Sequence, residues 1–128
     1  MNLDSLQLRK VLLSTFFKVQ PRSQIIVGEE LFMAAWVQGH RCQYYSKFLE
    51  DALLASATRH STSSAVRKLG KPYAERAKTQ IASELEQPNI SSLQGFLLLS
   101  DFEATRGRAR IGWTYSGNVS HNLADVMT

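Results

Sequence analysis

The sequence predicts an all-α protein, an irregular helical bundle of about five helices. Three observations lead to this expectation. Apolar side chains recur every three or four residues in several segments, as they do on one face of a helix. Proline and glycine fall between those segments, where helices begin or end. Hydrophobic residues make up 44% of the chain, which is enough for a packed core and too many for general disorder.

The first helix is expected between Asp4 and Gln20. Asp4 is the expected cap, with Gln7 reaching back in an arrangement like a capping box. Pro21 disfavours helix in the residue before it, so the helix should end near Gln20. The apolar positions at helical spacing are Leu8, Val11, Leu12, Phe16 and Val19.

Two further helices are expected before residue 60. The shorter one opens with Glu29 and Glu30, because acids favour the positive end of the helix dipole, and Gly39 is its natural end. The longer one runs from about Arg41 to Arg59. Its predicted core stripe consists of Tyr45, Phe48, Leu49, Ala52, Leu53 and Ser56.

Residues 60–88 are expected to hold a polar break, one helical turn and a fourth helix. The turn covers residues 65–69 and ends at Gly70. Pro72 suits the first position of the helix, and Pro88 ends it. The side chains expected to face the core are Ala74, Ala77, Ile81 and Leu85.

Two more helices are expected after Pro88. Ser91 and Gln94 form a predicted capping box, and the helix over 93–102 is apolar nearly all round, as buried helices are. The last helix runs from about residue 109 to 127 and ends without a capping residue. Its small residues at four-residue spacing, which would let another helix approach closely, are Gly112, Ser116 and Ser120. We therefore expect an incomplete domain that exposes apolar surface or self-associates.

The bulk properties narrow the class of protein. A length of 128 residues suggests one domain or part of one. No apolar run approaches the roughly 20 residues needed to span a bilayer, so we expect no membrane partner. The single cysteine, Cys42, excludes an internal disulfide and a multi-cysteine zinc site, and favours a reducing, intracellular compartment. A net charge of +4 permits contact with nucleic acid without demanding it.

No residue pattern in the chain indicates catalysis, a bound metal or a cofactor. His121 and Asp125 share a helical face, but a metal site needs a third ligand, and His40 and His60 lie in unrelated segments. Cys42 lies near His40 without any sign of an aligned base or an oxyanion site. We therefore expect a protein that is not an enzyme and that holds neither metal nor cofactor.

The strongest basic cluster consists of Arg106, Arg108 and Arg110. These arginines are candidates for contact with a partner or a phosphate. Their position favours the other interpretation, that they stabilise the carboxyl end of the preceding helix, where cations are favoured. Trp113 and Tyr115 have side chains that stack on bases in single-strand binders, but on an amphipathic helix we expect them to pack in the core.

The second half of the chain carries a distinctive order of motifs. An amphipathic helix ends in a Glu-x-Pro break, a helix with one glutamine and several leucines follows, and an Arg-Gly turn leads to a Trp-x-Tyr-x-Gly helix. The residues are Glu86, Pro88, Gln94, Leu97 to Leu99, Gly107, Arg108, Trp113, Tyr115, Gly117, Asp125 and Val126. This order resembles the middle regulatory domain of fungal zinc-cluster transcription factors.

The first half resembles the same domain more loosely. The matching segments are Leu12 to Pro21, Phe48 to Ser61 and Tyr73 to Leu85. Two positions depart from the family pattern, because Gln20 stands in place of a histidine and His121 stands where the family often has arginine.

The resemblance implies a nuclear regulator of transcription without catalysis, acting through protein partners, self-association or a ligand. In that family a separate zinc cluster reads DNA. This chain lacks such a cluster, so the implied DNA contact and zinc belong to a module outside it. Residues 1–128 would then be a partial regulatory domain. A stand-alone helical interaction module derived from the family is the alternative, followed by a small helical enzyme or ligand binder.

Overall fold

The computed structural model describes residues 2–20 and 26–105, and it confirms the all-α class. Within these ranges the helices follow one another with short connections, and no strand forms. The helices are α1 (Leu6–Val19), α2 (Glu29–Gln38), α3 (Lys47–Thr58), α4 (Ser64–Arg67), α5 (Gly70–Lys78), α6 (Ile81–Glu86) and α7 (Ile90–Thr105).

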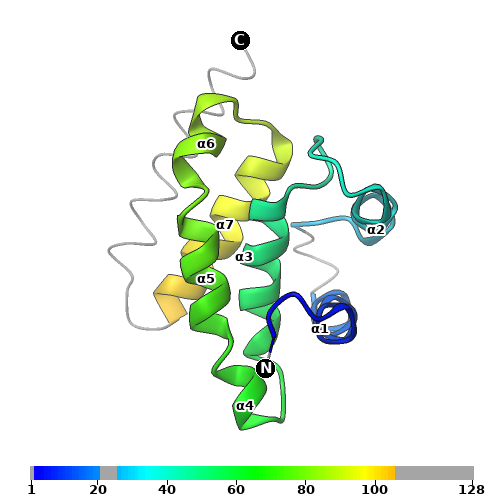
Figure 1. Cartoon of the computed structure of the whole chain (residues 1–128), viewed down its shortest axis with the longest axis vertical. Coiled ribbons are helices and arrows are strands. Elements are labelled where there is room, and N and C mark those ends of the chain that lie inside the picture. The colour runs from blue at the N-terminus through cyan, green and yellow to red at the C-terminus, as the bar shows by residue number, and fades with distance from the viewer. Residues whose placement is uncertain (1, 21–25, 106–128) are drawn as a thin grey trace.

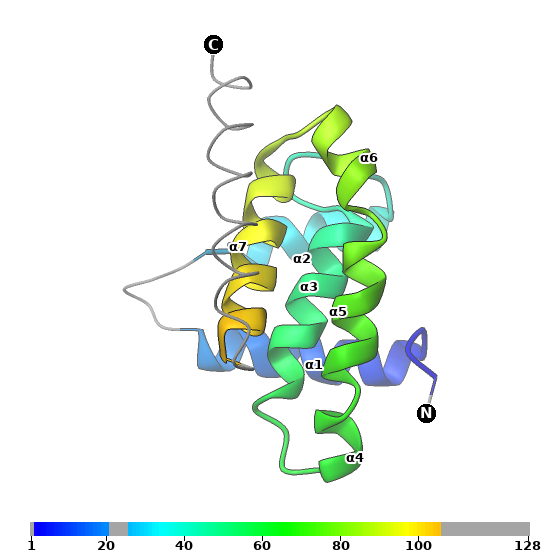
Figure 2. The ribbon, with the colours of Figure 1, turned by 90° about the vertical axis from the view of Figure 1, so that its left-hand side faces the viewer.

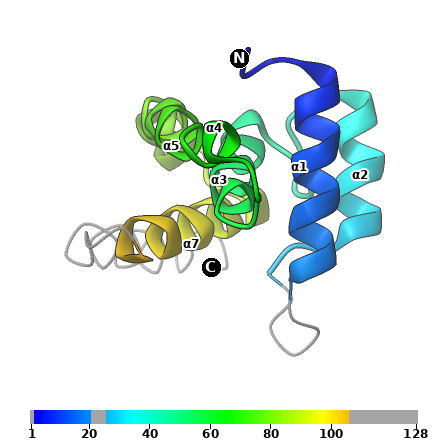
Figure 3. The same cartoon turned by 90° about the horizontal axis from the view of Figure 1, so that it is seen from below.

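Helix α3 lies at the centre of the bundle and packs against α1, α5 and α7 (Figure 1). In Figure 1, α3 and α5 run along the long axis of the molecule, whereas α1 and α2 are seen end-on and therefore cross them. Figure 2 shows α3 and α5 side by side. Figure 3 shows α1 and α2 side by side as a second layer. One central helix thus connects two layers of helices.

The core is built around α3, in which every residue from Phe48 to Thr58 is buried. Phe48 packs against Phe96 of α7 with ring centroids 5.0 Å apart. Tyr73 and Ala74 bring α5 into the same core with no exposed surface. Burying one large apolar side chain stabilises a fold by about 1.5–3 kcal/mol, so this shared core accounts for the central place of α3.

Helix α1 begins one residue later than expected and has a different cap. The side chain of Ser5 accepts the hydrogen bond from the backbone N–H of Leu8, and the predicted capping box of Asp4 and Gln7 does not form. Asp4 instead accepts a hydrogen bond from Arg76 at 3.0 Å. Asp4, the residue predicted to cap the helix, therefore pairs instead with a residue far away in the sequence. The predicted end at Gln20 is confirmed.

Helix α2 ends as predicted, whereas α3 starts later than predicted. Gly39 has φ +75°, a left-handed conformation that glycine adopts without steric cost. After it, Cys42 and Tyr45 exchange backbone hydrogen bonds of 2.8 and 3.3 Å across a tight turn. This turn keeps residues 41–46 out of the helix, and Ser46 caps α3 by accepting from the backbone N–H of Leu49.

The region between α3 and α7 contains more helices than expected. Gly70 begins α5 instead of ending the preceding turn, and Pro72 is therefore not at its first position. The single helix expected up to Pro88 is divided into α5 and α6 at Thr79 and Gln80. The Thr79 hydroxyl donates to a carbonyl of α5, and the Gln80 side chain donates to Asp51 of α3 at 2.8 Å. These bonds hold the chain in a turn that helix periodicity does not reveal.

Helix α7 follows the predicted break at Pro88 but is capped by other residues. Asn89 accepts from the backbone N–H of Ser92, and the Ser92 hydroxyl accepts from the backbone N–H of Asn89, both at 3.1 Å. The predicted capping box of Ser91 and Gln94 is therefore wrong. Most apolar residues between 93 and 102 are buried, as expected. Leu97 is exposed, with 38% of its surface accessible.

Candidate functional site

Two neighbouring acids, Glu50 and Asp51, lie fully buried near the start of α3, and we call them the carboxylate pair. Successive residues of a helix point about 100° apart, so the two side chains face different neighbouring helices. Burying an ionised carboxylate costs free energy unless an opposite charge and hydrogen-bond donors compensate it. The partners of each acid therefore define what the pair does.

Glu50 accepts hydrogen bonds from side chains of α1, of α2 and of the turn before α3. Arg9 donates through two nitrogens at 2.7 and 3.0 Å, the Tyr45 hydroxyl donates at 2.6 Å and the Trp36 indole N–H donates at 3.1 Å. The Arg9 guanidinium also lies 5.3 Å from the centre of the Trp36 ring. Burial opposes ionisation of Glu50, but the hydrogen bonds from Arg9 and Tyr45 lower its pKa below the ordinary value.

Asp51 makes the equivalent contacts on the α5 side. Arg76 donates to one carboxylate oxygen at 2.9 and 3.2 Å, and Gln80 donates to the other at 2.8 Å. Burial raises the pKa of Asp51 above its ordinary value, against the opposing effect of Arg76 and Lys47. The desolvation of this acid is therefore less fully compensated than that of Glu50.

Lys47 lies between the two acids on the first turn of α3. Its ammonium nitrogen is 3.6 Å from Glu50, 3.6 Å from Asp51 and 3.8 Å from Asp4. Three cations, those of Arg9, Lys47 and Arg76, thus face three carboxylates. A catalytic acid or base must come within hydrogen-bond distance of its substrate, and the carboxylate pair has no exposed surface on which to do so. The arrangement acts as a clamp between helices.

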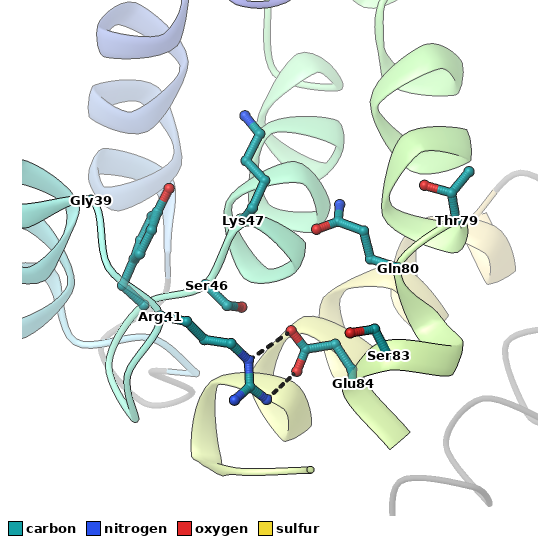
Figure 4. A pocket seen from close by; sticks show the side chains of 9 residues that line it. Gly39, Arg41, Ser46, Lys47, Thr79, Gln80, Ser83 and Glu84 are labelled. Atoms are coloured by element: carbon teal, nitrogen blue, oxygen red, sulfur yellow. Dashed lines mark hydrogen bonds and ion pairs between the residues drawn. The ribbon is translucent and has the colours of Figure 1, made fainter. Parts of the chain in front are cut away.

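A polar pocket of about 440 Å³ opens beside this clamp (Figure 4). Arg41 and Glu84 lie on one side of it, joined by hydrogen bonds of 2.8 and 3.4 Å. Arg41 also donates to the backbone carbonyl of Gln87 at 2.6 Å, and Ser92 donates to Glu84. The lining residues are Gly39, Arg41, Tyr45, Ser46, Lys47, Thr79, Gln80, Ser83 and Glu84. Such a lining suits a small polar molecule and contains no pairing of a nucleophile with a histidine base.

Gln94, a position in the resemblance, connects α7 to the segment before α2. Its amide nitrogen donates to the carbonyl of Ile26 at 2.9 Å. Its amide oxygen is buried and, among the described residues, has no hydrogen-bond partner. The side chain borders an apolar hollow of about 120 Å³, lined by Val27, Gly28, Leu31, Phe32, Tyr44, Ile90 and Gln94.

Three of the residues considered for metal binding or nucleophilic chemistry, His40, His60 and Cys42, lie in the described part of the chain. His40 and His60 are exposed, and Cys42 is half-buried beside Tyr45. Across residues 2–20 and 26–105, no group of three or more histidine, cysteine, aspartate or glutamate side chains is placed to share a metal ion. In the same ranges, no helix has both the length and the apolar character required to cross a bilayer.

Most of the site residues predicted from sequence lie outside the described part of the chain. These are Arg106, Arg108 and Arg110 as contact candidates, and Gly107, Trp113, Tyr115, Gly117 and Asp125 as positions of the resemblance, together with His121. The carboxylate pair escaped prediction, although two acids directly before the apolar run Ala52 to Ala55 were the available signal. Comparison of the chain with protein-family models, curated proteins and solved structures finds no match in any of the three.

Proposed function

We propose that this chain is a regulatory domain of the kind found in the middle of fungal zinc-cluster transcription factors, and that it regulates transcription in the nucleus without catalysis. The observation that carries the proposal is the order of motifs in its second half. The Glu86 and Pro88 break separates two helices, and the helix after it carries Gln94 and the leucines. The remaining positions of the resemblance contribute through sequence alone.

The chemistry of the buried charges agrees with a scaffold that presents surfaces. The charged side chains in the bundle interior connect one helix to another, as Arg9 does to Glu50 and Arg76 does to Asp51. Glu103 of α7 likewise meets Lys78 of α5. A domain with its interior charges engaged in this way works through its surface, and protein partners or a second copy are the proposed ligands. Sequence-specific DNA reading and zinc are assigned to a separate module.

A stand-alone helical interaction module remains the alternative function. The observation that favours it is a set of large apolar side chains exposed on α2 and its surroundings. They include Val37, which is 74% exposed, and Leu31, which is 54% exposed. Scattered exposed apolar residues are normal on protein surfaces. This observation therefore supports the alternative less strongly than the order of motifs supports the regulatory domain.

A tethered reporter experiment tests the proposal. The chain is fused between a heterologous DNA-binding domain and an activation domain in yeast, and reporter output is compared with that of the fusion lacking it. We expect the chain to change the output several-fold. Glu50→Gln, which weakens the clamp, should reduce the effect, and Glu75→Gln, which removes an exposed acid, should preserve it.

Two results distinguish the candidates. An unchanged reporter signal from a folded, nuclear fusion would refute the regulatory function. If the same chain nevertheless binds a defined protein partner, and Val37→Glu removes that binding, the interaction module becomes the better description.

A further inference from the structure

The segment formed by α4 and the start of α5 carries an open, basic hollow at the lower tip of the molecule (Figure 1). We call it the basic hollow; it encloses about 350 Å³ and is lined by Ser64, Arg67, Lys68 and Lys71. All four residues are exposed. Figure 3, which looks at the molecule from below, shows α4 towards the viewer, so a large ligand could approach it.

Within the part of the chain that the structure describes, the cations of the basic hollow differ from those of the bundle interior in having no acidic partner. Elsewhere in the described chain, ion pairs engage Arg9, Arg41, Lys47, Arg59, Arg76 and Lys78. Within the same described residues, none of the three cations of the hollow lies in an ion pair. The sequence explains this, because no aspartate or glutamate occurs between Asp51 and Glu75.

Among the described residues these three positive charges on one short segment have no acidic partner, and they repel one another. Arg67 is oriented by a hydrogen bond of 2.9 Å to the carbonyl of Ser61, and the two lysines are unrestrained. A positive patch without internal partners favours an anionic ligand, and its local potential attracts that ligand from solution.

The form of the hollow indicates which anion it accepts. It is shallow and its lining offers no aromatic side chain to stack on a base and no asparagine or glutamine to read a base edge. Recognition of a phosphoserine peptide uses arginine clusters with bidentate geometry, whereas this hollow has one arginine, which is already bonded to Ser61, and two lysines. Spread point charges suit a repeated series of phosphates.

We propose that the basic hollow contacts the phosphate backbone of duplex nucleic acid, independently of base sequence. This inference does not depend on the family resemblance. It concerns residues other than Arg106, Arg108 and Arg110, and it adds a non-specific contact to a chain that is not expected to read bases.

The proposal predicts how strongly the binding constant depends on salt concentration. Each phosphate neutralised on duplex DNA contributes about 0.9 to the slope of log K against log salt. The three cations of the hollow therefore contribute about 2.7 to that slope. Removal of the two lysines should lower the slope by about 1.8.

The experiment measures binding of the full chain to short, fluorescently labelled duplexes of two unrelated sequences, by anisotropy, between about 50 and 200 mM salt. The test variant is Lys68→Gln with Lys71→Gln. The matched control is Lys10→Gln with Lys18→Gln, which removes the same charge from two exposed lysines of α1 that have no ion pair among the described residues. Melting curves of both variants should stay close to that of the unchanged chain, because within the described residues these exposed lysines take part in no ion pair.

The expected result is equal binding to both duplexes, a slope reduced by about 1.8 in the test variant and a nearly unchanged slope in the control. An equal loss in both variants would show that net charge alone governs binding and would overturn the proposal. So would an absence of duplex binding at the lowest salt. Preferential binding of a phosphoserine peptide or of inositol hexakisphosphate, with competition against the duplex through Lys68 and Lys71, would assign the hollow to a different anion.

Discussion

Replacement of Glu50 by glutamine should destabilise the protein by about 3 kcal/mol. The size and shape of the side chain are kept, but one acceptor oxygen becomes an NH2 group. Four hydrogen bonds of 2.6 to 3.1 Å now converge on the carboxylate from Arg9, Tyr45 and Trp36. The NH2 group can accept none of them and faces donors instead.

The magnitude follows from the burial of the partners. Removal of one member of a buried ion pair costs about 3–5 kcal/mol, because the other charge is left without compensation. The Arg9 side chain keeps 22% exposure, so water can partly solvate its guanidinium, and the lower end of the range applies. For a chain of this length, about 3 kcal/mol corresponds to a fall of about 10 °C in Tm.

Chemical denaturation with circular dichroism measures this free energy. Glu75→Gln is the matched control, since it removes an exposed acid whose contact with Lys78 is an i,i+3 surface pair, and it should cost at most about 0.5 kcal/mol. A double-mutant cycle with Arg9→Gln should give a coupling energy of about 1 kcal/mol or more. If Glu50→Gln unfolds within about 0.5 kcal/mol of the unchanged chain, the clamp does not stabilise the bundle and the reasoning fails.

Three further predictions follow from the same structure. The pKa of Glu50 in the fold lies below its ordinary value of 4.5, so its stabilisation is complete above that pH and is lost as pH falls through the lower folded value. The pKa of Asp51 is raised, which acts in the opposite sense. In thermal melts across pH, Glu50→Gln should therefore make the loss of stability at acid pH less steep, and Asp51→Asn should make it steeper. At neutral pH, Asp51→Asn should destabilise the protein less than Glu50→Gln does. Gly95→Ala should destabilise the protein by about 1–2 kcal/mol, because its new Cβ would lie 2.5 Å from the Phe48 ring. This overpacking outweighs the gain of about 1 kcal/mol in helix propensity. An increase in Tm would contradict this prediction. Asn89→Ala should cost about 1 kcal/mol in denaturation experiments by removing the cap of α7, whereas no loss would show that Ser92 alone is sufficient.

The sequence was a good guide at three helix boundaries, but not at Gly70, which begins a helix instead of ending one. Gly39 and Pro88 ended or separated helices as predicted, and Gln20 marks the end of α1. These outcomes depend on backbone sterics, which act within a few residues. The same reasoning failed at Asp4 because its ion pair with Arg76 lies 72 positions away in the chain.

The carboxylate pair could not be inferred from periodicity. Helical pattern assigns acids to a solvated face, and it gave α3 a single apolar stripe. In the fold α3 is enclosed on all sides, so Glu50 and Asp51 had no solvated face to occupy. Their partners include residues of α1, α2 and α5, and a local sequence pattern does not predict that these helices pack around the start of α3.

The adjacency of Glu50 and Asp51 has a consequence for how the protein opens. One peptide bond separates the charged anchor of α1 from that of α5, so a local loss of helix at that point breaks the charged contacts of both together. Sub-global opening usually proceeds by units that can detach while the rest stays folded. Both layers also pack apolar side chains against α3, but their charged contacts share this one turn of the helix. Amide hydrogens of α1 and α5 should then exchange with solvent through a common opening event, as one cooperative unit.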